Sequence, residues 1–267
     1  MRLGISPFAS TRAGVLAVAT LAVEAGFETL WMGDGLLVND AFPAWSGAME
    51  PFTTLAWLGG RLPTARLGVS AAVLPLRDVV WTAKQAATLD QLTEGRFVLA
   101  VAPGFWAREL EFRGVDPAQR GVVFRRALGE LRAVFAGDTA ERVAPIPHTA
   151  GGPPIWLAGA DATFRLALAE GLPFQASRAS PADLAPLARR WHDAGGGLLG
   201  LRVRVSVADA VPSDAGVEWN ALVGPPKFLA EQLAAYRELG VGDVSIIPGQ
   251  DDESTLRTVV ALAEGLN

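Results

Sequence analysis

Few side chains in this sequence are suited to nucleophilic or acid–base chemistry, and Asp34 is the first to consider. The chain holds no cysteine and only two histidines, His148 and His192. A thiol nucleophile and a thiolate metal site are therefore excluded, and a histidine-rich metal site has no basis. Asp34 follows an apolar run that ends at Gly33. It could act in proton transfer beneath a loop, or it could cap that loop, as aspartates commonly do.

The second feature is a run of small residues at 69–72 (Val-Ser-Ala-Ala) inside the apolar segment 66–77. The segment is typical of a buried strand, yet these side chains are small for a strand that fills a core. Small residues can fit the taper of a barrel interior, and they can also let a planar ring approach the backbone. Arg77 follows this run, where it could meet an anionic substrate or a carboxylate such as Asp34.

Alternating strand and helix patterns must position these residues. Strand patterns occur eight times, at 2–6, 29–33, 66–74, 96–102, 154–158, 172–176, 200–207 and 243–247. Helix patterns follow them, at 12–25, 51–61, 78–92, 120–136, 162–170, 181–194, 225–239 and 252–265. This alternation predicts an α/β fold, a single (β/α)8 TIM barrel over residues 1–267. A doubly wound open sheet is the alternative, although the first turn lacks its glycine-rich motif.

In such a barrel the chemistry lies at the carboxyl ends of the strands and on the loops that follow them. The loops after the second and fourth predicted strands are long, at 34–50 and 103–119. Trp45 lies in the first loop, and Phe105 and Trp106 lie in the second. These aromatic residues predict either a large, flat, apolar ligand beneath the two loops or packing of the loops on the barrel.

Composition limits the partners of the protein. The net charge is −5 and no basic cluster occurs, which argues against a nucleic-acid partner. The apolar segment 13–23 is shorter than the roughly 20 residues that span a bilayer, and it fits a buried helix better than a signal peptide. The absence of cysteine fits a reducing compartment, so we expect a cytoplasmic protein with a small-molecule substrate.

The stretch 72–121 (AVLPLRDVVWTAKQAATLDQLTEGRFVLAVAPGFWARELEFRGVDPAQRG) resembles the luciferase-like monooxygenase family, which includes bacterial luciferase and F420-dependent oxidoreductases. The similarity extends to 22–34 and 153–174, and more weakly to 224–241. The run AK-x-x-ATLD-x-L-T-x-GR at 83–96 is its most specific part. The resemblance implies a (β/α)8 barrel that binds a reduced flavin or deazaflavin, frequently as a homodimer.

The resemblance also implies where the cofactor would bind. A cis peptide bond between Ser70 and Ala71 would support the central ring, the loop at 102–105 would line it, and a helix N-terminus would hold its phosphate. The cofactor-binding residues implied in this way are Ser70, Ala71, Ala72, Ala102, Pro103, Gly104, Phe105, Gly159, Ala160 and Thr163. Asp34 is then the candidate catalytic residue, and the candidate substrate-binding residues are Trp45, Trp106 and Arg77.

The sequence departs from the family at two of these places. Many members carry a histidine directly after the acidic residue that ends the second strand, whereas Gly35 follows Asp34 here. Neither His148 nor His192 is placed to substitute for it, and we expect structural roles for both. Asp161 lies beside the implied phosphate site, where its carboxylate could cap the helix and would repel a phosphate unless it pointed away.

Two functions follow from these observations. The first is an oxidoreductase that uses F420, or alternatively FMN, for hydride transfer or monooxygenation of a small organic substrate. The Ala-, Arg- and Gly-rich composition resembles that of high-GC actinobacteria, where F420 is common, and so favours F420. The second is a non-catalytic barrel that binds a flavin or another apolar ligand and has lost the histidine. A hydrolase is disfavoured because the sequence lacks a cysteine, a well-placed histidine and a paired-carboxylate motif.

Overall fold

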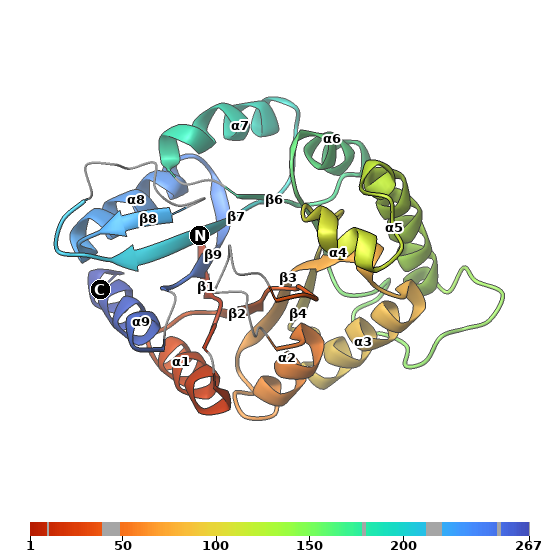
Figure 1. The fold of residues 1–267 in the computed structure, drawn as a ribbon, viewed down its shortest axis with the longest axis horizontal. Coiled ribbons are helices and arrows are strands. Elements are labelled where there is room, and N and C mark those ends of the chain that lie inside the picture. The colour runs from red at the N-terminus through yellow and green to blue at the C-terminus, as the bar shows by residue number, and fades with distance from the viewer. Residues whose placement is uncertain (10, 39–48, 178–179, 212–220, 250–251, 267) are drawn as a thin grey trace.

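We analysed a computed structural model of the protein, in which residues 1–9, 11–38, 49–177, 180–211, 221–249 and 252–266 are described. Its centre is a closed barrel of eight parallel strands (Figure 1). The barrel strands are β1 (Arg2–Ile5), β2 (Thr29–Met32), β3 (Arg66–Val73), β4 (Phe97–Ala102), β5 (Ile155–Ala158), β6 (Phe174–Ser177), β7 (Leu199–Val207) and β9 (Val241–Ile247). The pairs β6–β7, β7–β9 and β9–β1 complete the ring.

Helices surround this barrel as a ring (Figure 1). The surrounding helices are α1 (Arg12–Glu24), α2 (Pro51–Gly59), α3 (Val79–Leu92), α5 (Arg120–Ala136), α6 (Asp161–Glu170), α7 (Pro181–Asp193), α8 (Pro226–Glu238) and α9 (Asp252–Leu266). The short helix α4 (Ala107–Phe112) lies inside the ring that the others form. Within the described ranges, no helix combines the length and apolarity needed to cross a bilayer.

Side-chain caps fix where several of these helices begin. Thr11, Asp78 and Ser180 accept hydrogen bonds from backbone N–H groups of the first turns of α1, α3 and α7. Such caps satisfy donors that the helix itself leaves free. Proline occupies the first turn of α2 and of α7, where its missing N–H costs nothing.

The predicted barrel and its series of strands and helices are confirmed, and four short elements were missed, two of them the 3-10 helices Leu74–Leu76 and Pro117–Gln119. The four-residue strand β8 (Ala221–Gly224) pairs in parallel with the carboxyl half of β7. Helix α4 lies within the segment 103–119, which we predicted to be a loop. The other helix and strand boundaries differ from the prediction by two residues at most at either end.

Most apolar side chains of the strands point outward and pack against the helices. This outer core includes Leu30, Leu67, Leu99, Leu157 and Leu201, all fully buried. A smaller cluster lies inside the barrel, and its buried members are Trp31, Ala71, Val98, Ala100 and Trp156. The alternation of side chains along each strand produces these two layers.

The lower end of the barrel, where the strands begin, is filled by large side chains. The rings of Trp31 and Trp156 lie with their centroids 5.4 Å apart. Arg66 donates to Asp243 across 2.9 Å, and its guanidinium lies 5.5 Å from the Trp156 ring centroid. Gly68 makes room for this packing, since a Cβ there would lie 2.4 Å from the Trp31 ring. The barrel is therefore closed at its lower end.

Candidate active site

The upper end of the barrel, where the strands finish, begins with an irregularity in β3. Val69 pairs with Leu99 and Ala72 pairs with Val101, so β3 carries one extra residue opposite β4. The extra residue is a β-bulge, and its effect is to turn two successive residues, Ser70 and Ala71, toward the barrel interior. The peptide bond between them is cis, as the resemblance implies.

Ala72 behaves differently from the two residues before it. Its side chain is fully buried in the outer core between the sheet and the helices. It therefore adds to the barrel wall, and only its backbone is available to the interior.

Small side chains surround the bulge inside the upper end. Ala71 belongs to the inner cluster, and Ala102 and Ala158 pack against that cluster from the neighbouring strands. Gly33 lies beside them at the end of β2, and a Cβ there would approach the Arg202 guanidinium to 3.0 Å. A Cβ at Gly33 would also lie 3.0 Å from Cζ of Phe8, so one buried aromatic ring lies at the upper end beside these small residues.

Polar groups reach this upper end from opposite sides of the barrel. Ser70 on β3 donates a hydrogen bond of 2.7 Å to Oε1 of Gln175 on β6, and both residues are buried. In the described part of the chain, Nε2 of Gln175 and the hydroxyls of Ser6 and Ser245 are buried without a hydrogen-bond partner. Buried polar groups are nearly always paired in native proteins, so these groups point to a ligand or ordered water.

Arg202 places a cation in the same end of the barrel. Desolvation lowers the pKa of Arg202 to about 10, and the nearby charge of Arg204 acts in the same direction. Our sequence reasoning missed both Gln175 and Arg202. For Arg202 a signal was present, because the alternation in LRVRVSV puts Arg202 and Arg204 opposite the apolar face of β7.

The loop after β4 follows the expected course beside the bulge. Ala102, Pro103 and Gly104 are half-buried where the strand ends. Gly104 has a positive φ of 80°, and a Cβ there would lie 2.8 Å from the Val73 side chain. Phe105 is 56% exposed, and half-buried Trp106 occupies the residue before α4. The loop thus passes directly over the exit of β3.

Asp34 and Arg77 contact each other at the upper end. Two hydrogen bonds, of 2.7 and 2.6 Å, join the guanidinium to the carboxylate, which also accepts from the Val73 N–H at 2.9 Å. The exposed fractions of the two side chains are 6% and 16%. Of the two partners we considered for Arg77, the carboxylate is the one observed.

Glu50 extends this ion pair toward α2. Its carboxylate accepts from Arg77 at 3.0 Å and from the Thr53 N–H at 2.7 Å. Desolvation opposes the charge of Arg77, but the hydrogen bonds and the attraction of Asp34 and Glu50 outweigh it and raise the pKa of Arg77. Burial acts likewise against the charge of Glu50, yet the bonds from Thr53 and Arg77 lower the pKa of Glu50. Arg77 thus joins Asp34 and Glu50 in one hydrogen-bonded network.

Glu109 connects the two long loops and was not anticipated from the sequence. It lies in the first turn of α4 and is buried, and its Oε1 accepts from the N–H groups of Leu36 and Leu37 at 2.6 and 3.0 Å. The residues after β2 are therefore attached to the helix after β4. An acidic residue in a polar loop gives no sequence signal for such a long-range contact.

The predicted phosphate site lies at the N-terminus of α6. Gly159 and Ala160 are exposed, Thr163 is buried, and Ala160 provides no side-chain cap. A Cβ at Gly159 would lie 2.6 Å from the Thr163 hydroxyl, so glycine permits this close approach. The first N–H groups of an uncapped helix favour an anion.

Asp161 does not cap α6, contrary to one of the two roles that we considered. Its carboxylate pairs with Arg165 and, at 3.0 Å, with Arg190. The hydrogen bond from Arg190, followed by the charge of Arg165, lowers the pKa of Asp161. Two guanidinium groups therefore accompany the carboxylate that we expected to repel a phosphate.

The remaining predicted residues lie elsewhere. Trp45 falls outside the described residues. His192 Nε2 contacts the Leu239 carbonyl oxygen at 3.1 Å, and His148 lies beside Gly95, so both histidines are away from the upper end. Among the described residues, no group of three or more His, Asp or Glu side chains could hold a metal ion.

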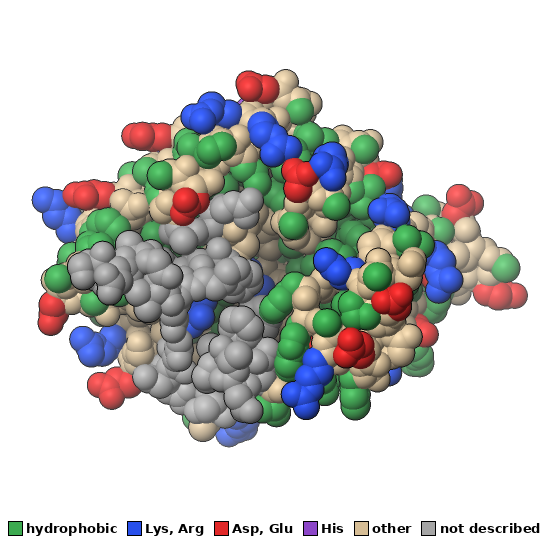
Figure 2. All heavy atoms as spheres, turned by 45° about the horizontal axis from the view of Figure 1, so that its top comes forward, with side chains coloured by type: hydrophobic (Ala, Val, Ile, Leu, Met, Phe, Trp, Pro, Cys, Tyr) green, Lys and Arg blue, Asp and Glu red, His purple; other side chains and the backbone are tan. Residues whose placement is uncertain are grey.

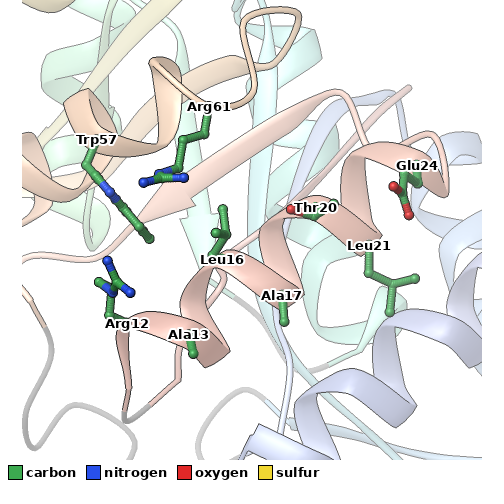
Figure 3. Close-up of a pocket in the computed structure, with 9 residues that line it drawn as sticks. All are labelled: Arg12, Ala13, Leu16, Ala17, Thr20, Leu21, Glu24, Trp57 and Arg61. Carbon is green, nitrogen blue, oxygen red and sulfur yellow. The ribbon is translucent and has the colours of Figure 1, made fainter.

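The outer surface differs from the barrel interior. Acidic and basic side chains are intermixed on the face that Figure 2 displays. A groove of about 420 Å³ lies on the outside, between α1 and α2 (Figure 3). Arg12, Leu16, Trp57 and Arg61 line it, and the Arg61 guanidinium lies 5.2 Å from the Trp57 ring centroid. The groove is separated from the bulge by the wall of the barrel.

Comparison with known proteins identifies a family. The family model described as luciferase-like monooxygenase matches residues 5–196. The flavin-dependent trigonelline monooxygenase oxygenase component of Acinetobacter baylyi is 25% identical over 159 residues, 55% of this chain and 43% of that protein. The chain spans between about a third and just over half of the length of the first curated relatives that it matches.

Solved structures share the fold over the full chain. The monooxygenase RslO1 from Streptomyces bottropensis superposes with a TM-score of 0.83 at 18% identity, covering 100% of this chain and 98% of that one. An F420-dependent secondary alcohol dehydrogenase, solved with an F420–acetone adduct, gives a TM-score of 0.81 at 14% identity, with 100% and 99% covered. At these identities the likeness establishes the barrel fold.

Proposed function

Because the chain belongs to the luciferase-like monooxygenase family, we propose that it is an oxidoreductase that acts on a small organic substrate with reduced F420, or alternatively FMN. The observation that carries the proposal is the β3 bulge. It turns Ser70 and Ala71 inward at the upper end of the barrel, where Ala102 and Ala158 are small neighbours. A flat ring needs such close access to the backbone.

The residues present fit a cofactor of this shape. Ser70, Ala71 and the backbone of Ala72 would support the ring, and the segment 102–105 would lie along its side. An unpaired donor on Gln175 is available to a ring acceptor. Gly159, Ala160 and Thr163 would hold the phosphate at the uncapped start of α6, with Arg165 and Arg190 nearby.

The protein's own part in the reaction is to orient and to exclude water. When bound, the cofactor supplies the hydride or activates oxygen. Glu109 holds the residues after β2 against α4, which covers the site, and Phe105 and Trp106 offer apolar surface to a substrate. Asp34 positions the exit of β3 through Val73 and Arg77, and proton transfer by Asp34 would require that ion pair to open.

A non-catalytic binding barrel is the second candidate. It is favoured by the engagement of Asp34 with Arg77 and by the distance of both histidines from the upper end. Such a protein would bind the cofactor ring but would not catalyse its oxidation or reduction.

Binding and turnover experiments separate these two functions. Purified protein is titrated with oxidised FMN and with F420 while the protein and ligand fluorescence are followed. Reduced cofactor is then mixed with oxygen or with small ketones and aldehydes, and its oxidation is measured. Ring binding with faster oxidation supports the oxidoreductase, and ring binding without it supports the second candidate. Failure of both rings to bind at about 1 mM, an affinity of only ~4 kcal/mol, would overturn the proposal. The predicted homodimer is tested in the same preparation by light scattering.

A further inference from the structure

Gln175 on β6 is the most informative polar residue in the barrel that the family comparison leaves unassigned. We propose that its side-chain amide is a ligand anchor: Ser70 fixes its orientation, and its Nε2–H donates to a carbonyl oxygen of the bound redox ring. This inference rests on the proposed function, because it assumes that the ring binds at the upper end.

The contact between Ser70 and Gln175 crosses the barrel. β3 and β6 are not neighbours, since β4 and β5 lie between them, and the two residues are 105 positions apart in the sequence. The hydrogen bond of 2.7 Å therefore shows that the Gln175 side chain runs through the interior toward β3. Its neighbours in the sheet are Ala158 and Gly200, which leave this path open.

The Ser70 hydroxyl also determines which amide atom remains available. It donates to Oε1, so the acceptor of the amide is satisfied and Nε2 is the donor that remains. Gln175 is 2% exposed, and in the described part of the chain Nε2 has no partner. A buried donor without a partner destabilises a protein, so a ligand that places an acceptor at this N–H would gain a hydrogen bond.

The surrounding charges indicate which acceptor suits the site. Arg202 follows Gly200 by two positions on β7 and pairs with Ser177 in the sheet, so its side chain starts one layer above Gln175. An amide donor with a cation nearby favours an oxygen that gains negative charge. A ring carbonyl conjugated to the reducible nitrogen or carbon gains such charge on reduction, whereas an apolar substrate offers no acceptor. The ring carbonyl is the acceptor that this environment fits.

The test compares two quantities, the stability of the protein without ligand and its affinity for the ring. In the double variant Ser70→Ala/Gln175→Leu, both partners of the hydrogen bond and the unpaired donor are removed together. Such paired removal is nearly neutral or stabilising for a folded protein. We expect the melting temperature without ligand to equal or exceed that of the wild type. The Kd for oxidised F420 or FMN, measured by fluorescence, should rise about 10-fold, which corresponds to about 1.4 kcal/mol.

A matched control and a second readout make the outcomes decisive. Thr82→Val removes a buried hydroxyl of α3 that donates to the Asp78 carbonyl at the start of the same helix, so it should leave the Kd unchanged. Gln175→Leu should also lower the reduction potential of the bound ring, because the donor favours the reduced form. If the wild type binds a ring and the double variant binds it equally well, the role of Gln175 is overturned. If the wild type binds neither ring, the proposed function falls and this inference falls with it.

Discussion

The two ends of the barrel are built from the same strands but differ in the side chains that occupy the interior. At the lower end, Trp31 and Trp156 fill the interior and Arg66 pairs with Asp243. At the upper end, alanines line the interior and Gln175 keeps an unpaired donor. Among the described residues, buried polar atoms without a partner occur at both ends, Trp31 Nε1 and Asp243 Oδ1 at the lower one, so the ends differ in the size of the side chains inside the barrel. Such a difference is expected where a protein binds a ligand.

The largest effect on stability is expected when the packing of the lower end is disrupted. Gly68→Ala places a methyl group 2.4 Å from the rigid Trp31 ring and should destabilise the protein by about 3 kcal/mol. Urea denaturation measures this change. Gly129→Ala in α5 is the control, because nothing lies near its added Cβ and the helix should gain about 0.5–1 kcal/mol. Equal stability of Gly68→Ala and wild type would refute a tightly packed lower end.

The Arg66–Asp243 pair predicts a pH dependence that also originates at the lower end. Desolvation outweighs the attraction of Arg66 and raises the pKa of Asp243 to about 6 in the folded protein, above its unfolded value. The folded state therefore binds the proton more tightly, and its contribution to stability is present below about pH 4 and lost as pH rises through 6.

Between pH 4 and 7 we expect the wild type to lose about 2 kcal/mol of unfolding free energy relative to Asp243→Asn. Parallel stability curves for the two proteins over this range would show that Asp243 titrates normally. Comparing the two proteins cancels the contributions of all other titrating groups.

Substitution of Glu109 should have an intermediate effect on stability, this time at the upper end. Glu109→Ala leaves the N–H groups of Leu36 and Leu37 without their acceptor and should cost about 1–2 kcal/mol. It should also speed ring dissociation, measured by stopped-flow fluorescence, because the cover over the site is loosened. Glu111→Ala, an exposed neighbour in α4, is the control and should change neither quantity. Unchanged dissociation in Glu109→Ala would mean that this contact does not cover the ligand.

The smallest stability effect is expected where the effect on binding is largest. Ala102→Leu adds three carbons at the half-buried exit of β4 and should alter stability by less than about 1 kcal/mol. It should block ring binding in the fluorescence titration. A large loss of stability would show that the upper end is packed as tightly as the lower one.

The barrel was predictable from the sequence because its strands and helices alternate with clear hydrophobic periods. The four-residue strand β8 and the six-residue helix α4 were missed because they are too short to show a period. The bulge at Ser70 and Ala71 was located only through the family resemblance.

The contacts that define the site were less predictable than the fold. The contact between Asp34 and Arg77 was one of two possibilities considered from the sequence, since the two residues follow neighbouring strands. The contacts of Gln175 and Glu109 could not be predicted, because their partners Ser70 and Leu36 lie 105 and 73 residues away. Those contacts exist only once the barrel closes and α4 folds over it, and no local pattern encodes them.

A crystal structure with oxidised F420 or FMN bound tests the central claim most directly. We predict density for the ring against the backbone at Ser70 and Ala71, with a ring carbonyl within hydrogen-bond distance of Gln175 Nε2. A ring bound away from β3, or an upper end that stays closed to both cofactors at saturating concentration, would contradict it.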